Sequence, residues 1–159
     1  MFSLIKKSSM DQIDKAILYQ LQRNAKLNTK EVANRVGLSV TPTYERIKKL
    51  EKQGIIKSYV ALLDQGKIDK QVISFCQISL AKHSKKLLDN FRNNISNLPE
   101  VLECHQVTGD YDFIIKVAVN VIPDFHTFIN KKLAIIKGIS KIRSSISVDM
   151  IKESTAFDL

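Results

Sequence analysis

The spacing of hydrophobic residues changes along the chain. In the first third, apolar residues recur at helical spacing in three short segments separated by polar, turn-forming residues. From about residue 70 onward, segments with the two-residue alternation of β-strands are interleaved with helical segments. The pattern therefore predicts an α+β protein, with a small helical domain followed by a domain of strands and helices.

The first two predicted helices carry clear start and stop signals. The first follows Ser9 or Asp11 as its cap and ends near Leu21. The second has Asn28 as its cap with Glu31 three residues later, the spacing of a capping box. Gly37 ends it, because glycine readily adopts the positive φ of a helix terminus. The residues predicted to face the core are Ile13, Ile17, Leu18, Leu21, Val32, Ala33 and Val36.

The third helix is predicted to begin at Ser39 or Thr41 and to end before Gly54. Its predicted inward stripe is Val40, Tyr44, Ile47 and Leu50. Ile55–Tyr59 then reads as an extended stretch, a β-wing or a linker strand.

Residues 28–54 together predict a helix-turn-helix. Ala33 is small enough for a close helix crossing, Gly37 makes the turn, Leu38 fills the space beneath it, and Ser39 caps the next helix. The second helix of this motif enters the major groove with its N-terminal residues at the base edges. Threonine suits base-edge acceptors and thymine methyls, arginine suits guanine or phosphate, and lysine suits phosphate. The predicted DNA-binding residues are Ser39, Thr41, Thr43, Arg46, Lys48, Lys49 and Lys52.

The second half predicts the element order β-α-β-β-α-β, a ferredoxin-like arrangement. Gly109–Asp110 has the form of a two-residue hairpin turn between the second and third strands. Both helices of such a fold cover one face of an antiparallel sheet, and the bare face usually pairs with a second copy. A homodimer is therefore expected. The predicted elements span residues 70–80, 84–98, 101–108, 111–119, 123–136 and 142–150.

Charge and composition narrow the function. Residues 1–64 hold 12 lysines and arginines against 6 acidic residues, whereas residues 65–159 hold 13 against 10. The basic excess per residue is about three times larger in the helical domain, which favours a polyanionic partner there. No apolar run is long enough to span a bilayer, and residues 1–9 have no signal-peptide pattern, so a cytoplasmic, nucleoid-associated protein with a flexible leader is expected.

Catalytic and metal chemistry find little support in the sequence. Only five glycines are present, too few for a phosphate-cradling loop, and no nucleophile–base pair is apparent. His83, His105 and His126 lie in separate elements without metal-ligand spacing, and Cys76 and Cys104 form no zinc cluster. We therefore expect no enzyme activity, no metal and no cofactor.

Two strings resemble a known family. Residues 39–54, SVTPTYERIKKLEKQG, resemble the recognition helix of Lrp/AsnC transcription regulators, and Met10–Asp14 is similar to the family's opening helix. Residues 103–113, ECHQVTGDYDF, are similar to the family's sensor-domain signature. The resemblance implies a winged helix-turn-helix joined to an α/β sensor domain that binds amino acids, dimerises and often forms octamers.

Carried over by position, the resemblance also implies an effector site beside the 109–112 turn. Gln106, Ser145 and Ser147 stand where apolar or larger residues are common in the family, which implies a more polar site. Polar amino acids such as glutamine, asparagine and lysine are therefore at least as plausible as leucine as effectors. The implied lining is Gln106, Gly109, Asp110, Asp112, Phe125, Ser145, Ile146 and Ser147.

The sequence thus predicts a leader over residues 1–9, a winged helix-turn-helix over 10–60, a linker over 61–69 and a ligand-sensing, oligomerising domain over 70–159. The leading hypothesis is a regulator that binds a specific duplex DNA sequence and whose assembly or DNA affinity responds to an amino acid or a related metabolite. The alternative is an architectural, nucleoid-like protein that wraps DNA and has no effector.

Overall fold

The computed structural model describes residues 10–159, so the predicted leader lies outside the described residues. The chain forms two compact units. The helical unit comprises residues 10–62 together with Lys152–Leu159. The second unit, which we call the sensor unit after its predicted role, comprises Leu63–Ile151. The last eight residues, which the sequence predicts to belong to the second domain, also contact the helical unit. The Gln22 side chain donates to the Phe157 carbonyl at 2.6 Å and accepts from the Phe157 N–H at 2.9 Å.

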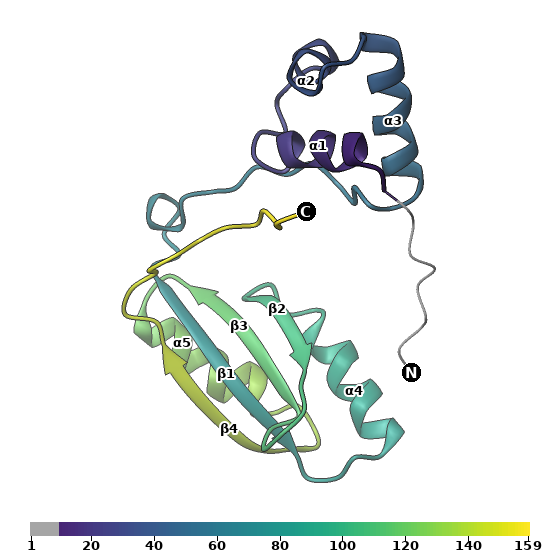
Figure 1. Cartoon of the computed structure of the whole chain (residues 1–159). Helices are drawn as coiled ribbons and strands as arrows, with labels where there is room; N and C mark the ends of the chain where they lie inside the picture. The colour runs from purple at the N-terminus through teal and green to yellow at the C-terminus, as the bar shows by residue number, and fades with distance from the viewer. Residues whose placement is uncertain (1–9) are drawn as a thin grey trace. The chain divides into compact units, whose positions relative to one another are not determined.

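The helical unit is built from three helices, α1 (Gln12–Leu21), α2 (Thr29–Val36) and α3 (Val40–Lys52) (Figure 1). Apolar residues from all three meet in one core, as their helical spacing predicts. Asp11 is the cap of α1, and its side chain accepts from the Asp14 N–H at 2.8 Å. The buried members of this core are Ile17, Leu18, Leu21, Val32, Ile47 and Leu50.

The predicted helix-turn-helix is confirmed. Asn28 and Glu31 form both hydrogen bonds of a capping box at the start of α2. Gly37 ends α2 with φ of +71°, and the Leu38 N–H returns to the Ala33 carbonyl at 3.0 Å. Ala33 is buried, in agreement with the close approach of neighbouring helices at that position.

Two of the four α3 residues predicted to face the core do not face it. Ile47 and Leu50 are buried, but Val40 and Tyr44 point to solvent with 46% and 51% of their surface exposed. Thr43 takes the inward position one turn before Ile47 and is fully buried. Spacing alone favoured the apolar side chains, but α3 is rotated so that a threonine faces the core.

No strand is formed in residues 53–71, which come directly after α3. Among the described residues 53–71 there is a turn after α3, an unpaired stretch and the short η1 (Gln65–Lys67). The strand predicted over Ile55–Tyr59 is therefore not formed. Ile55 and Ile56 instead pack against the core of the helical unit.

The sensor unit confirms the predicted element order. Its sheet has the strand order β2-β3-β1-β4, with every neighbouring pair antiparallel. This is the ferredoxin-like arrangement expected from the sequence. The elements are β1 (Val72–Leu80), α4 (Lys85–Ile95), β2 (Val101–Gln106), β3 (Phe113–Val119), α5 (Ile122–Phe128), η2 (Ile129–Leu133) and β4 (Ile139–Ile146).

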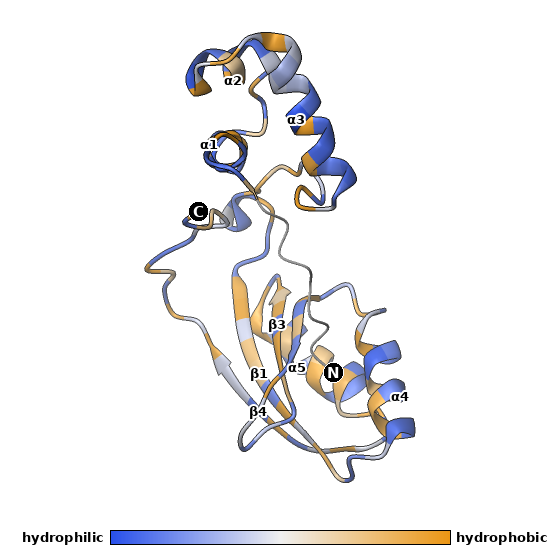
Figure 2. Cartoon of the chain, turned by 45° about the vertical axis from the view of Figure 1, so that its right-hand side comes forward, coloured by the Kyte–Doolittle hydropathy of each residue, from blue (hydrophilic) through white to orange (hydrophobic). Residues whose placement is uncertain are grey.

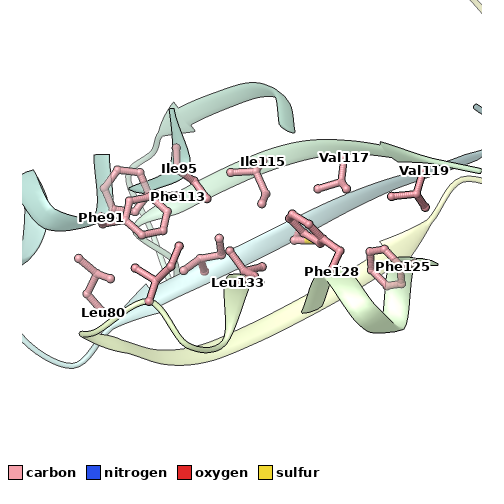
Figure 3. Close-up of a cluster of buried hydrophobic side chains, with 13 residues drawn as sticks. Leu80, Phe91, Ile95, Phe113, Ile115, Val117, Val119, Phe125, Phe128 and Leu133 are labelled. Atoms are coloured by element: carbon pink, nitrogen blue, oxygen red, sulfur yellow. The ribbon is translucent and has the colours of Figure 1, made fainter. Parts of the chain in front are cut away.

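A single core lies between the sheet and its helices (Figure 3). Alternate residues of β1 and β3 face α4 and α5, as the two-residue period of strands requires. The rings of Phe91 and Phe113 stack with their centres 4.3 Å apart. Figure 2 shows hydrophobic residues along much of the sheet and hydrophilic residues over much of α4. The fully buried residues of this core are Cys76, Ile78, Phe91, Phe113, Ile115, Val117, Phe128 and Leu133.

Three predicted details of the sensor unit are wrong. The chain between β2 and β3 is a six-residue loop from Val107 to Asp112, where a two-residue turn was predicted. The last strand ends at Ile146, so Val148 and Met150 lie beyond it. The second helix gives way at Ile129 to the π-helical η2. Ile136 is nevertheless buried as predicted.

Neither α4 nor α5 covers the other face of the sheet. Phe75 pairs with Lys116 on one side and Ser145 on the other, and its side chain is exposed. Gln77 pairs in the same way with Ile114 and Arg143. No helix among the described residues is long and apolar enough to cross a membrane.

Candidate DNA interface and effector site

The residues on the outward side of α3 are exposed and take no part in the core. We call these residues the α3 outer surface. Its first half is uncharged except for Glu45, and its second half carries three lysines. Ser39 precedes it at the cap position, and its hydroxyl makes no capping hydrogen bond. The α3 outer surface comprises Val40, Thr41, Tyr44, Glu45, Lys48, Lys49 and Lys52, all of them exposed.

The lysines of the α3 outer surface differ in their surroundings. Lys48 lies 2.8 Å from Glu51 and 5.6 Å from the centre of the Tyr44 ring. Their hydrogen bond raises the pKa of Lys48 and lowers the pKa of Glu51. The Tyr59 hydroxyl donates to Glu51 at 3.0 Å, and burial together with this bond raises the Tyr59 pKa to about 12. Lys49 and Lys52 form no ion pair within residues 10–159, which leaves them available to phosphates.

Arg46, predicted to contact DNA, is held inside the helical unit. One of its guanidinium nitrogens lies 2.7 Å from both an Asp11 and an Asp14 oxygen. The Asp14 side chain is only 4% exposed, so its charge is compensated chiefly by this arginine. Hydrogen bonds from the Asp14 N–H and from Arg46 lower the pKa of Asp11. In this structure Arg46 joins α3 to α1, and its predicted contact with DNA stays a prediction.

Thr43 was also predicted to contact DNA, but the structure buries it. Its side chain is fully buried, and its hydroxyl donates to the Ser39 carbonyl at 2.9 Å. A buried hydroxyl satisfied in this way costs little and has no access to a base. Of the predicted residues, Ser39, Thr41, Lys48, Lys49 and Lys52 keep their outward positions. Tyr44 was missed because its apolar ring matched the predicted core stripe.

The loop between β2 and β3 is anchored by Asp112. One oxygen of its carboxylate accepts from the Leu80 N–H at 2.7 Å, and the other lies 2.6 Å from His83 Nε2. The Asp112 N–H in turn donates to the Ile78 carbonyl at 2.9 Å. Asp112 thus fastens the loop to the end of β1, and its carboxylate is occupied by protein groups.

An open hollow of about 520 Å³ lies beside this loop. Asp110 is exposed and has no side-chain partner among residues 10–159, so it offers a free carboxylate. Tyr111 lies beneath the Lys141 ammonium, 5.6 Å from the ring centre. The Gln106 side-chain amide oxygen accepts from Arg92 at 2.9 Å. The lining is Gln77, Gln106, Val107, Thr108, Asp110, Tyr111 and Ile114.

The structure brings together only part of the predicted effector set. Gln106 and Asp110 line the hollow, and Gly109 lies between two lining residues with φ of +111°. Phe125 is buried in the core on the helix-covered face and does not line this hollow, so its predicted effector contact stays a prediction.

The β4 residues of the predicted set lie elsewhere on the sheet. Ser145 pairs with Phe75, three residues along β1 from the Ile78 carbonyl that holds the loop. At about 3.3 Å per residue this separates Ser145 from the loop by about 10 Å. Ile146 and Ser147 continue away from the loop, so none of these three residues lines the hollow. Local sequence signals do not select Gln77 and Ile114, which meet through strand register, or Tyr111, which the loop brings to the hollow.

A helix-turn-helix unit followed by a ferredoxin-like unit with an open hollow defines a two-domain DNA-binding regulator. The model of the Lrp/AsnC ligand binding domain matches residues 73–157, and a model described as winged helix-turn-helix DNA-binding matches residues 10–57. The leucine-responsive regulatory protein of Escherichia coli K12 is 32% identical over 145 residues, which span 91% of this chain and 88% of that protein. The chain belongs to the Lrp/AsnC family of transcription regulators.

Solved structures agree with this assignment. A transcriptional regulator from Neisseria meningitidis in complex with L-methionine matches with a TM-score of 0.91 and 30% identity, covering 94% of this chain and 97% of that chain. An AsnC family transcriptional regulator from Agrobacterium tumefaciens matches with a TM-score of 0.89 and 36% identity, with the same coverage. The fold and its order along the chain are therefore those of the family.

Proposed function

We propose that this protein is a sequence-specific DNA-binding regulator whose assembly or DNA affinity is modulated by an amino acid or a related metabolite. The observation that carries the DNA-binding half is the α3 outer surface, which is exposed and has no part in the core. Recognition helices place such residues in the major groove. Of the predicted set, Ser39, Thr41, Lys48, Lys49 and Lys52 remain the proposed DNA contacts. Its place of action is then the nucleoid in the cytoplasm.

The hollow beside the β2–β3 loop is the proposed effector site. An amino acid needs acceptors for its ammonium group and donors for its carboxylate. Asp110 supplies a free carboxylate for the ammonium, and the Gln77 and Gln106 amides supply polar partners. The methionine complex of the Neisseria relative supports an amino acid, and Val107 and Ile114 suit an apolar side chain.

The proposed assembly is a homodimer formed through the helix-free face, which associates further to an octamer. Phe75 is exposed on that face, and Gln77 and Ile114 extend it to the rim of the hollow. Ser145 pairs with Phe75 on the same face. The 73–157 match to a ligand binding domain gives no support to an architectural protein without an effector.

Calorimetric titration of the full chain with each of the twenty amino acids tests the effector proposal. We expect saturable binding of at least one of them, with L-methionine as the first probe. Asp110→Asn removes the charged acceptor and should weaken that binding about 10-fold to 100-fold, because hydrogen bonds to charged groups contribute about 1.5–3 kcal/mol.

Asp149→Asn is the matched control, an exposed aspartate outside the hollow that should leave binding unchanged. No heat from any amino acid at millimolar concentration would refute the effector proposal. Equal loss in both variants would move the site away from Asp110.

A further inference from the structure

We infer that the α3 outer surface reads thymine methyl groups, through Val40 and Tyr44, and makes no arginine contact to guanine. This inference rests on the proposed DNA-binding function and names the base chemistry that α3 recognises. Three observations support it. The first half of the α3 outer surface is largely apolar, each arginine of the helical unit contacts another residue of that unit, and the lysines lie in the second half of α3.

The first half of the α3 outer surface is unusually apolar for an exposed helix start. Val40 and Tyr44 are four residues apart, so they lie on one face one turn from each other. They are 46% and 51% exposed, and neither is in the core of the helical unit. Thr41 adds a further methyl group beside them. N-terminal residues of a recognition helix meet base edges, and the apolar group at the major-groove edge is the thymine methyl.

The arginines of the helical unit are all committed to protein contacts among residues 10–62. Arg46 binds Asp11 and Asp14 at 2.7 Å. The Arg23 guanidinium lies 3.5 Å from the centre of the Tyr19 ring, and Arg35 donates to the Gln20 side chain at 3.1 Å. Arginine to guanine O6 and N7 is the commonest specific contact in the major groove. Of these three arginines only Arg46 is on α3. If it turned away to contact a base, the buried Asp14 carboxylate would lose its cationic partner.

The lysines occupy the second half of α3, beyond the base-reading positions. Lys48 lies between Glu51 and the face of the Tyr44 ring, which leaves Lys49 and Lys52 as the unpaired cations. Lysines at this place on a recognition helix suit the phosphate backbone. The apolar base contacts therefore fall on Val40, Thr41 and Tyr44, with Ser39 and Glu45 as the exposed polar residues of the same half.

The test uses a duplex enriched from a random DNA pool by the full-length protein. Each thymine of that duplex is replaced in turn by deoxyuridine, which removes only the methyl group. We expect at least one position at which affinity falls about fourfold, the effect of one methyl-sized apolar contact. Replacing each guanine by 7-deazaguanine, which removes the N7 acceptor, should change affinity less than twofold.

The effect must also belong to α3. Val40→Ala and Tyr44→Ala should each bind the parent duplex more weakly, and at the affected position one of them should no longer distinguish thymine from deoxyuridine. Tyr19→Ala is the matched control, because Tyr19 is 44% exposed but lies on α1. A bound duplex with no deoxyuridine effect, or with a loss above 10-fold on 7-deazaguanine, would overturn the inference and leave the proposed function standing. Failure to enrich any duplex would overturn both.

Discussion

Replacing Arg46 with alanine is expected to lower the free energy of opening α1 and α3 by about 3 kcal/mol. The substitution leaves the Asp14 carboxylate, which is 4% exposed, without its guanidinium partner. Removing one member of a buried pair costs more than the pair itself contributes, because the remaining charge stays buried. The Arg46 side chain is 32% exposed, which places the expected loss at the lower end of the usual range. Hydrogen–deuterium exchange of peptides from α1 and α3 measures this opening directly.

Arg35→Ala is the matched control for this change. Arg35 lies on the surface and its one hydrogen bond is to the exposed Gln20, so the expected loss is below about 0.5 kcal/mol. A variant Arg46→Ala that keeps full exchange protection and loses only DNA binding would return Arg46 to the DNA-contact set.

The same contact makes the helical unit sensitive to acid. The Asp11 pKa is lowered, first by the Asp14 N–H and then by Arg46. The stabilisation is therefore complete above the ordinary aspartate pKa of about 4 and is lost as pH falls through the lowered value. In Arg46→Ala this acid dependence should weaken.

Replacing Lys48, Lys49 and Lys52 together with alanine is expected to have the largest effect on DNA binding. Each lysine that neutralises a phosphate contributes about 0.9 to the slope of log affinity against log salt. The triple variant should therefore reduce that slope by up to about 2.7 per bound protomer, with the affinity loss greatest at low salt. Fluorescence anisotropy of a labelled duplex over a range of salt concentrations gives both quantities.

Lys82, Lys85 and Lys86 provide a control of equal charge. They are exposed near the start of α4 in the sensor unit, and their triple alanine variant should leave the slope nearly unchanged. If both triple variants reduce the slope equally, the DNA contact is spread over the protein and the α3 assignment is wrong.

Local signals in the sequence were sufficient for the elements and their order. The Asn28–Glu31 capping box and the positive φ of Gly37 are properties of a few neighbouring residues, and both are present as predicted. The alternating residues of β1 and β3 likewise determine which face is buried.

Contacts between distant residues were beyond such signals. Arg46 meets partners 32 and 35 residues away, so its sequence neighbourhood shows only a cation on a helix. Thr43 can be buried because its hydroxyl donates a hydrogen bond to the Ser39 carbonyl. With Thr43 facing inward, Tyr44 faces outward. Asp112 binds the Leu80 N–H across the sheet, and this contact accompanies a six-residue loop in place of the predicted tight turn.

The central claim, that an amino acid at the β2–β3 loop controls DNA binding through α3, is tested by one binding isotherm. The full chain is titrated onto its enriched duplex with and without a saturating amino acid identified by calorimetry. We predict at least a fivefold change in the DNA dissociation constant, the lower end of typical coupling between sites, and a smaller change in Asp110→Asn at the same amino-acid concentration. Superimposable isotherms for the unsubstituted protein, with and without the amino acid, would contradict it.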